Sequence, residues 1–385
     1  MEKNATFDDI RPYHNDEIVP IMERLVKDPE FKRVMGFIFP EKDWEQLAAL
    51  LRSFKTRHDF QHGLIKGTVY EMVGKTSAAI ECSGFENIEA NKAYTYISNH
   101  RDIILDASLL ASMLALSGYD TTEVAIGDNL LLHPWIEDLV RLNKAFIVKR
   151  GVSIRQMLEV STHLSQYIHF AIKEKKESVW IAQREGRAKD SNDRTQESLL
   201  KMLAMGGTQD ILTNLKELNI TPVSFSYEYD PCDYLKAKEF QQKRDDPEFK
   251  KSKADDLLNM ETGLFGYKGC IHFQIGRPIN PALEKVDAGQ PKNELIVEIA
   301  SLIDTGIFLN YKFYPINYIA YDRLWGKNRF AGEYTEEDIK TFDTYLDKQL
   351  KKIDLENKDI PFLTERILEM YAYPVKNQLE VKGKE

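Results

Sequence analysis

Cysteine is scarce in this chain, and the long apolar runs that membrane-spanning helices need are missing. The three cysteines, Cys82, Cys232 and Cys270, lie far apart and form no CxxC pair, so the sequence predicts neither a zinc site nor a disulfide framework. A reducing cytoplasm is the compartment that fits best. The longest apolar stretch, residues 103–116, is interrupted by Asp106 and is shorter than the roughly 18 residues of a spanning helix. The expected membrane contact is therefore peripheral.

Positive charge is also in deficit, since 52 Lys and Arg residues face 61 Asp and Glu residues and the net charge is −9. With no basic tract, this balance argues against general nucleic-acid binding. The sequence contains neither a P-loop nor a dinucleotide fingerprint. Most histidines have no paired spacing with other ligand residues, so no metal site is predicted.

The chain divides into three regions by its apolar periodicity. Residues 1–90 are predicted to be helical, with apolar spacing of three and four residues over 16–27 and 43–54 and a third helix over 62–80. Residues 91–280 are predicted to form an α/β domain, and residues 281–385 a helical C-terminal region. An excess of Lys and Arg over 51–80 fits either contact with an anionic membrane surface or a packed helix with a solvated basic edge.

The middle region alternates strands with helices, which is typical of an α/β fold with a mixed or largely parallel sheet. The predicted strands cover residues 93–97, 123–126, 145–149, 178–182, 222–227 and 270–275. Residues 229–265 form a long charged excursion between two of these strands. A connection of that length is usually an inserted helix, a mobile lid or a binding loop, and a solvated helical insertion is favoured.

The polar corner Ser98-Asn99-His100-Arg101-Asp102 lies between a predicted strand and a predicted helix. Asp102 is a plausible N-cap for that helix, and His100 stands where α/β folds tend to place their reacting groups. Asp106, one turn into the helix, is close enough to face the imidazole. A His beside a carboxylate makes a general base. Since no Ser or Cys nucleophile with a supporting motif accompanies the pair, the base is expected to activate a substrate hydroxyl.

Asn99-His100, five residues and then Asp106 resembles the His-Asp motif of the glycerolipid acyltransferases, the PlsC-like superfamily. Most members place four residues between His and Asp, and some bacterial branches place five. A second block, residues 145–150, is an apolar strand that ends in Lys149-Arg150 and resembles the block whose terminal Arg binds the acceptor phosphate. A late strand that begins near Pro222 resembles the family's fourth block.

The third block of the resemblance, often written FPEGTRS in the family, reads Gln183-Arg184-Glu185-Gly186-Arg187-Ala188-Lys189 here. Glu185 and Gly186 match the pattern. The usual Pro is Arg184, and the usual Arg position holds Ala188. Arg187 is the candidate for the displaced cation, and Lys189 is a further cation that can act with it.

The resemblance implies an O-acyltransferase of glycerolipid synthesis that takes its acyl group from acyl-CoA or acyl-carrier protein and needs no cofactor. It implies His100 and Asp106 as catalytic residues, and Asn99, Arg150, Glu185, Gly186, Arg187 and Lys189 as substrate-binding residues. The acceptor stays open between glycerol 3-phosphate, lysophosphatidate and a lyso-aminolipid. Two other classes also stay open, namely a thioester hydrolase and a non-catalytic lipid-binding module.

Overall fold

The computed structural model describes residues 7–326 and 328–383, without the side chains of residues 65, 66 and 68. These residues contain one seven-stranded sheet with the order β1-β7-β6-β2-β5-β3-β4. The strands are β1 (Ala79–Ser83), β2 (Thr95–Ser98), β3 (Glu123–Gly127), β4 (Ala145–Val148), β5 (Val179–Ala182), β6 (Ile220–Tyr227) and β7 (Cys270–Ile275). Neighbouring strands are parallel except for β6 and β7, which are antiparallel. The predicted α/β fold with a mixed, largely parallel sheet is confirmed.

Strand β1 corrects the predicted N-terminal boundary. Residues up to 80 were expected to be helical, but the helix ends at Gly74 and Ala79 to Ser83 pair in parallel with β7. Only Ile80 and Cys82 give this edge strand an apolar side, and both are half-buried against the sheet's core. The sheet therefore draws its first strand from the region that was predicted to be purely helical.

The helices surround the sheet in three groups along the chain. The first comprises α1 (Ile18–Leu25), α2 (Pro29–Ile38), α3 (Trp44–Ser53), α4 (Arg57–Phe60) and α5 (Lys66–Gly74). The second comprises α6 (Leu105–Leu116), α7 (Pro134–Leu142), α8 (Ile154–Phe170), α9 (Glu197–Leu203), α10 (Ile211–Glu217), α11 (Asp233–Asp245) and α12 (Lys253–Phe265). The third comprises α13 (Asn280–Leu283), α14 (Lys292–Phe308), α15 (Pro315–Tyr321), α16 (Glu336–Lys352) and α17 (Ile360–Lys382).

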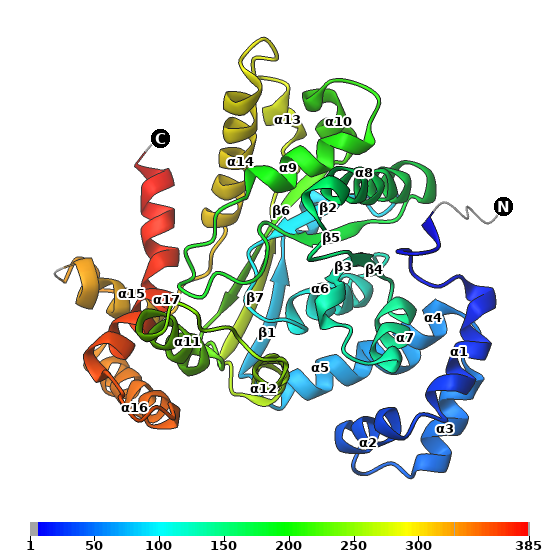
Figure 1. Cartoon of the computed structure of the whole chain (residues 1–385). Helices are drawn as coiled ribbons and strands as arrows, with labels where there is room; N and C mark the ends of the chain where they lie inside the picture. The colour runs from blue at the N-terminus through cyan, green and yellow to red at the C-terminus, as the bar shows by residue number, and fades with distance from the viewer. Residues whose placement is uncertain (1–6, 327, 384–385) are drawn as a thin grey trace.

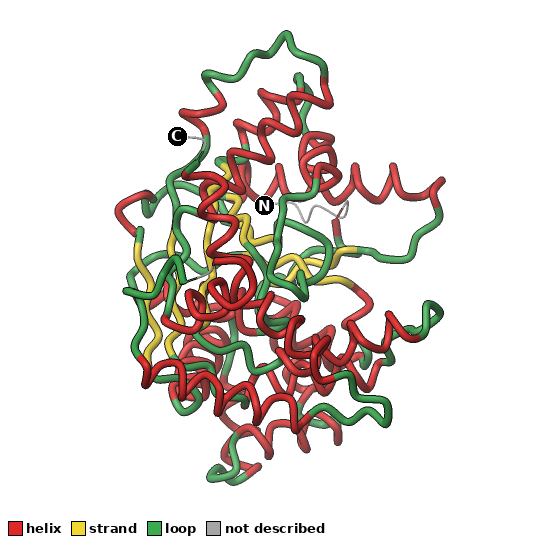
Figure 2. Tube along the Cα trace, turned by 90° about the vertical axis from the view of Figure 1, so that its left-hand side faces the viewer, coloured by secondary structure: helices red, strands yellow, loops and turns green. Residues whose placement is uncertain are grey.

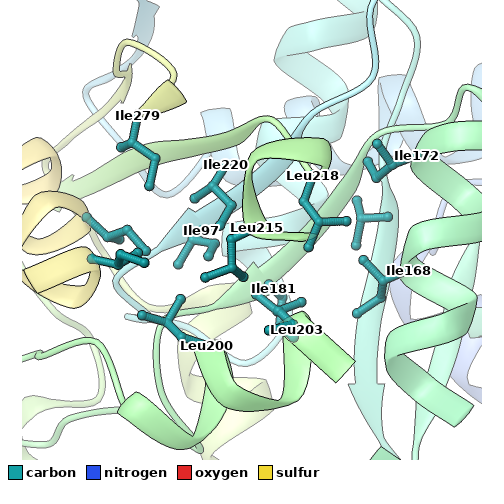
Figure 3. Close-up of a cluster of buried hydrophobic side chains, with 14 of the residues drawn as sticks. Ile97, Ile168, Ile172, Ile181, Leu200, Leu203, Leu215, Leu218, Ile220 and Ile279 are labelled. Atoms are coloured by element: carbon teal, nitrogen blue, oxygen red, sulfur yellow. The ribbon is translucent and has the colours of Figure 1, made fainter. Parts of the chain in front are cut away.

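Separate apolar clusters cover the two faces of the sheet, and the strands lie in the interior between helices (Figure 2). On one face, strand residues pack against α8, α9, α10 and α14. Figure 3 shows Ile97, Ile181 and Ile220 from the strands against Leu200, Leu203 and Leu215 from the helices. On the other face, α6 packs against the aromatic side chains of β2, β5 and β6. Because side chains alternate along a strand, successive residues of each strand face opposite clusters.

The terminal helices form two further clusters beside the sheet (Figure 1). The N-terminal helices bury their own apolar core, and Arg57 lies 4.0 Å from both Glu123 and Glu177 of the central domain. That cation of the basic 51–80 segment therefore faces protein carboxylates. In the described part of the chain, none of the helices is long and apolar enough to cross a membrane.

The insertion between β6 and β7 is helical, as predicted, but it is not simply solvated. Residues 229–265 form helices α11 and α12. Helix α11 buries Lys236, Ala237 and Glu239. It packs against the C-terminal helix α17, so the insertion joins the C-terminal region to the sheet. Its length is explained by this packing rather than by a free loop.

Candidate active site

The polar corner after β2 is held by its own side chains. The Asp102 Oδ1 atom accepts hydrogen bonds from the backbone N–H groups of Ile104 (2.9 Å) and Leu105 (2.8 Å). Helix α6 begins at Leu105 and its N-cap is Ile104, so the prediction of Asp102 as the N-cap residue is wrong, although the Asp102 carboxylate does bind N–H groups at the start of the helix. Burial raises the pKa of the Asp102 carboxyl, and the nearby Asp106 charge acts in the same direction. The corner thus concentrates two buried acids beside His100.

His100 and Asp106 are in direct contact, as their spacing predicts. The His100 Nδ1 atom lies 2.8 Å from Asp106 Oδ2. The Asp106 side chain is fully buried, whereas 15% of the His100 side chain is exposed. The His100 ring also packs edge-on against Trp180, with 5.6 Å between ring centroids. A carboxylate at Nδ1 favours the tautomer with its proton on that nitrogen, so Nε2 is left as the basic atom.

Asp106 is oriented by three more hydrogen bonds. Its Oδ2 accepts the backbone N–H groups of Arg101 (2.6 Å) and Asp102 (3.0 Å), and its Oδ1 accepts the Tyr227 hydroxyl (2.9 Å). Burial raises the pKa of Tyr227 well above its usual value, and the Asp106 charge adds to this effect. Tyr227 lies at the end of β6, 121 residues after Asp106. The contact forms because β2 and β6 are neighbours in the sheet, and the sequence alone does not show that pairing.

Asn99 has a positioning role in the structure, in place of the predicted contact with substrate. Its side-chain nitrogen donates to the Phe225 carbonyl (2.9 Å) and its side-chain oxygen accepts the Phe225 N–H (2.8 Å). The residue is fully buried. Both the nitrogen and the oxygen of the Asn99 side chain form hydrogen bonds with the backbone of β6. Asn99 therefore extends the pairing of β2 with β6 and fixes where His100 leaves the sheet.

Arg101 joins the corner to the loop that follows β5. Its guanidinium contacts the Ser191 hydroxyl and pairs with the Asp193 carboxylate, and all three side chains are buried. Sequence reasoning missed this pair, because nothing local distinguishes Asp193 from the other acids of a charged loop.

The second and third blocks meet at the carboxyl ends of β4 and β5. The Arg150 Nη1 atom lies 2.7 Å from Glu185 Oε1, so a carboxylate of the third block pairs with the cation of the second. Gly186 has a φ of +67°, a left-handed conformation that favours glycine, although nothing lies within 4 Å of the position a Cβ would take. The turn therefore requires glycine for its backbone conformation and not for space.

The other two predicted cations of the third block turn towards the insertion. The Arg187 Nη2 atom donates to Asn259 Oδ1 of α12 (3.0 Å), and Lys189 pairs with Glu239 of α11. Helix α12 also packs its Gly263 against the Asp102 carboxylate, where a Cβ would collide. The insertion therefore forms one wall of the site. Its helices α12 and α11 bind the side chains of Arg187 and Lys189.

A cavity of about 470 Å³ lies elsewhere, between the outer side of β4 and α8. Its polar residues satisfy one another, since Asp9 pairs with Lys149 (2.5 Å) and with His163 (3.0 Å). None of the predicted site residues lines this cavity. The site is therefore defined by the polar cluster around His100.

Comparison with known proteins bears on this cluster directly. Residues 79–226 match the family model described as Acyltransferase. A similar solved structure is the 1-acyl-sn-glycerophosphate (LPA) acyltransferase PlsC from Thermotoga maritima, with 13% identity, a TM-score of 0.36, and coverage of 74% of this chain and 92% of that chain. The curated proteins contain no match. The matched segment holds His100, Asp106, Arg150 and Glu185, so the residues of the polar cluster lie in the part of the chain that is similar to the Acyltransferase family.

Proposed function

We propose that the protein is an O-acyltransferase that moves a fatty acyl group from acyl-CoA or acyl-carrier protein to the hydroxyl of a glycerophosphate or lyso-glycerophosphate acceptor. The observation that carries the proposal is the His100–Asp106 contact of 2.8 Å, in which the carboxylate also accepts two backbone N–H groups and a tyrosine hydroxyl. Four donors converge on one buried Asp, so the imidazole is held in a single orientation. Preorganisation of this kind is what a general base requires.

The reaction needs one base and no redox step. His100 Nε2 takes the proton of the acceptor hydroxyl as the oxygen attacks the thioester carbonyl. The C–S bond then breaks, and the thiolate leaves and takes up the proton from the imidazolium. The products are an oxygen ester and a free thiol. Asp106 stabilises the imidazolium that forms between the two proton transfers.

Arg150 offers the acceptor a cation at the rim of the site. Its side chain is 36% exposed and is paired with Glu185, which is 70% exposed. An ion pair this open to solvent contributes little to stability, so an acceptor phosphate can displace the Glu185 carboxylate at small cost. The guanidinium fork suits such an exchange, because it meets carboxylate and phosphate oxygens in the same bidentate geometry.

The product of the purified protein tests this function. The protein is incubated with acyl-CoA or acyl-carrier protein and, in parallel, with glycerol 3-phosphate, lysophosphatidate or a lyso-aminolipid, and the products are identified by mass spectrometry. A new monoacyl or diacyl ester supports the transferase and names its acceptor. Free fatty acid as the only product would replace it with a hydrolase, and a folded protein without turnover would replace it with a lipid-binding module.

Tyr227→Phe is expected to lower the rate of acyl transfer about tenfold, because one hydrogen bond to a buried charge is worth about 1.5 kcal/mol and about 1.4 kcal/mol changes a rate tenfold. The loss should appear in kcat with KM unchanged, since the hydroxyl acts on Asp106 and not on substrate. Steady-state kinetics over a range of pH measure it. An equal loss in the Tyr96→Phe variant, whose buried side chain lies on the same apolar face, would assign the effect to packing.

We also propose that the protein contacts an anionic membrane surface through the first turns of α8. What supports this is the exposure of three apolar side chains spaced three and four residues apart: Ile154 is 88% exposed, Met157 52% and Leu158 65%. Arg150 precedes this face in the chain and Arg155 follows Ile154, and both cations complement negatively charged headgroups. Since Arg150 also ends β4 beside Glu185, a membrane at this face would lie next to the acceptor's entry.

The double variant Ile154→Glu/Leu158→Glu is expected to reduce binding to anionic vesicles at least about tenfold, since burial of one such side chain is worth about 1.5–3 kcal/mol. Co-sedimentation with phosphatidylglycerol vesicles measures it. Val297→Glu is the control, because Val297 is an exposed apolar residue of α14, 52% accessible, and should bind as the wild type does. Unchanged binding of the double variant would place the contact elsewhere.

A further inference from the structure

Arg184 stands where the family pattern has Pro and, like Arg187 and Lys189, adds a positive charge to the third block. The other cations near the site are already engaged: Arg150 by Glu185, Lys189 by Glu239, and Arg187 by Asn259. Arg187 is engaged through Nη2 alone, since its Nη1 atom is buried without a hydrogen-bond partner. The half-buried Arg184, by contrast, has no hydrogen-bond or ion-pair partner within residues 7–326 and 328–383.

The sheet register places Arg184 beside His100. Ser98 of β2 is the direct partner of Ala182 of β5, and the Gln183 N–H continues this ladder to the Ser98 carbonyl at 2.8 Å. His100 is the second residue after the end of β2, and Arg184 is the second residue after the end of β5. Side chains two residues apart share a face, and the Trp180 ring already touches His100 on that face. Arg184 therefore lies in the backbone segment next to the one that carries the base.

Electrostatics agree with this placement. Burial raises the pKa of Asp193, and the positive charges of Arg101, Arg184 and His100 all act on it in the opposite direction. Arg184 and His100 are thus within reach of the same buried carboxylate. Asp193, however, is already the ion-pair partner of Arg101, so Arg184 is left without a counter-ion of its own.

We propose that Arg184 binds the phosphate of the acceptor and makes the protein select a phosphomonoester over a neutral or zwitterionic lyso-aminolipid. The inference rests on the proposed function for the identity of the acceptor, but not for the presence of an anion site. A guanidinium without a counter-ion gains two charge-assisted hydrogen bonds from a phosphate dianion. A zwitterionic amine headgroup would instead bring a second cation beside it. In this arrangement Arg187 positions α12 through its hydrogen bond to Asn259.

The source of the phosphate is a separate question, because acyl-CoA and the acyl-carrier prosthetic group carry phosphates as well. Binding experiments with single ligands distinguish these sources. They also work when turnover fails, so loss of the anion site and failure of the proposed reaction are recognised separately. The His100→Ala background prevents reaction during the measurement.

The experiment is isothermal titration of the full chain with glycerol 3-phosphate, with lysophosphatidate in neutral micelles, and with acyl-CoA. Arg184→Gln is expected to weaken the affinity for the phosphorylated acceptor about 10- to 100-fold, as expected for the loss of a charge-assisted contact, while acyl-CoA binds normally. Arg184→Lys should recover part of the loss. The control is Arg194→Gln, in the same loop, whose guanidinium faces Asn377 and Glu380 of α17 and should have no effect.

Three results would overturn the inference. The first is an unchanged acceptor affinity in Arg184→Gln, and the second is a loss confined to acyl-CoA. The third is a wild-type protein that binds neither phosphorylated acceptor, or that binds a lyso-aminolipid equally well. In a protein that turns over normally, any of these removes the role of Arg184 and leaves the role of His100 in place.

Discussion

Acyl transfer is expected to fall by at least about 10²–10⁴-fold in His100→Ala, because a positioned general base typically contributes that much. The fold should survive the change. The imidazole is bonded at Nδ1 to Asp106, and that carboxylate keeps three other donors when the ring is removed. Product formation by mass spectrometry and the thermal unfolding midpoint, measured on the same preparation, test the two halves of this prediction.

His133→Ala is the matched control. The His133 side chain is 45% exposed and pairs with Glu30 at 3.1 Å, on the N-terminal helical side of the molecule. It should keep full acyl transfer. If His100→Ala retained near wild-type transfer in a folded protein, a different group would have to deprotonate the acceptor, and the proposed mechanism would be lost.

The elements that the sequence predicted well are those whose signals are local. Six strands lie within about two residues of their predicted positions, because short β-branched and aromatic runs bounded by turn residues identify buried strands. Helix α2 was missed although its signal is present: Asp28 caps the backbone N–H groups of Glu30 and Phe31, and Pro29 occupies the first turn. Strand β1 has only five residues, with Glu81 and Ser83 among them, and β7, its partner, follows it by about 190 residues.

The same distinction holds in the site. His100 and Asp106 are six residues apart around one strand-to-helix corner, so their contact was readable from spacing alone. The contacts of Asp106 with Tyr227, of Arg101 with Asp193 and of Arg187 with Asn259 join segments 121, 92 and 72 residues apart. These depend on strand order and on the docking of α12. The sequence contains the residues but not the register that brings them together.

The buried Arg101–Asp193 pair leads to the largest expected change in stability. Arg101→Met is expected to lower the free energy of unfolding by about 3–5 kcal/mol, since removal of one partner leaves an uncompensated charge in the interior. The Asp193 side chain is fully buried, and that of Arg101 is 7% exposed. Urea denaturation followed by circular dichroism measures the loss. A change below about 1 kcal/mol, the value for exposed ion pairs, would show that the pair is solvated.

A double variant separates the charge from the geometry that the pair maintains. Arg101→Met/Asp193→Leu removes both charges and should be more stable than Arg101→Met, because apolar residues of similar volume can replace a buried pair at little cost. Its activity, however, should stay low. The Arg101 backbone N–H donates to Asp106, and the guanidinium fixes that backbone against the loop that follows β5. With the stability recovered and kcat still reduced, the pair would be a positioning device for the catalytic corner; recovery of both would reduce it to a stability element.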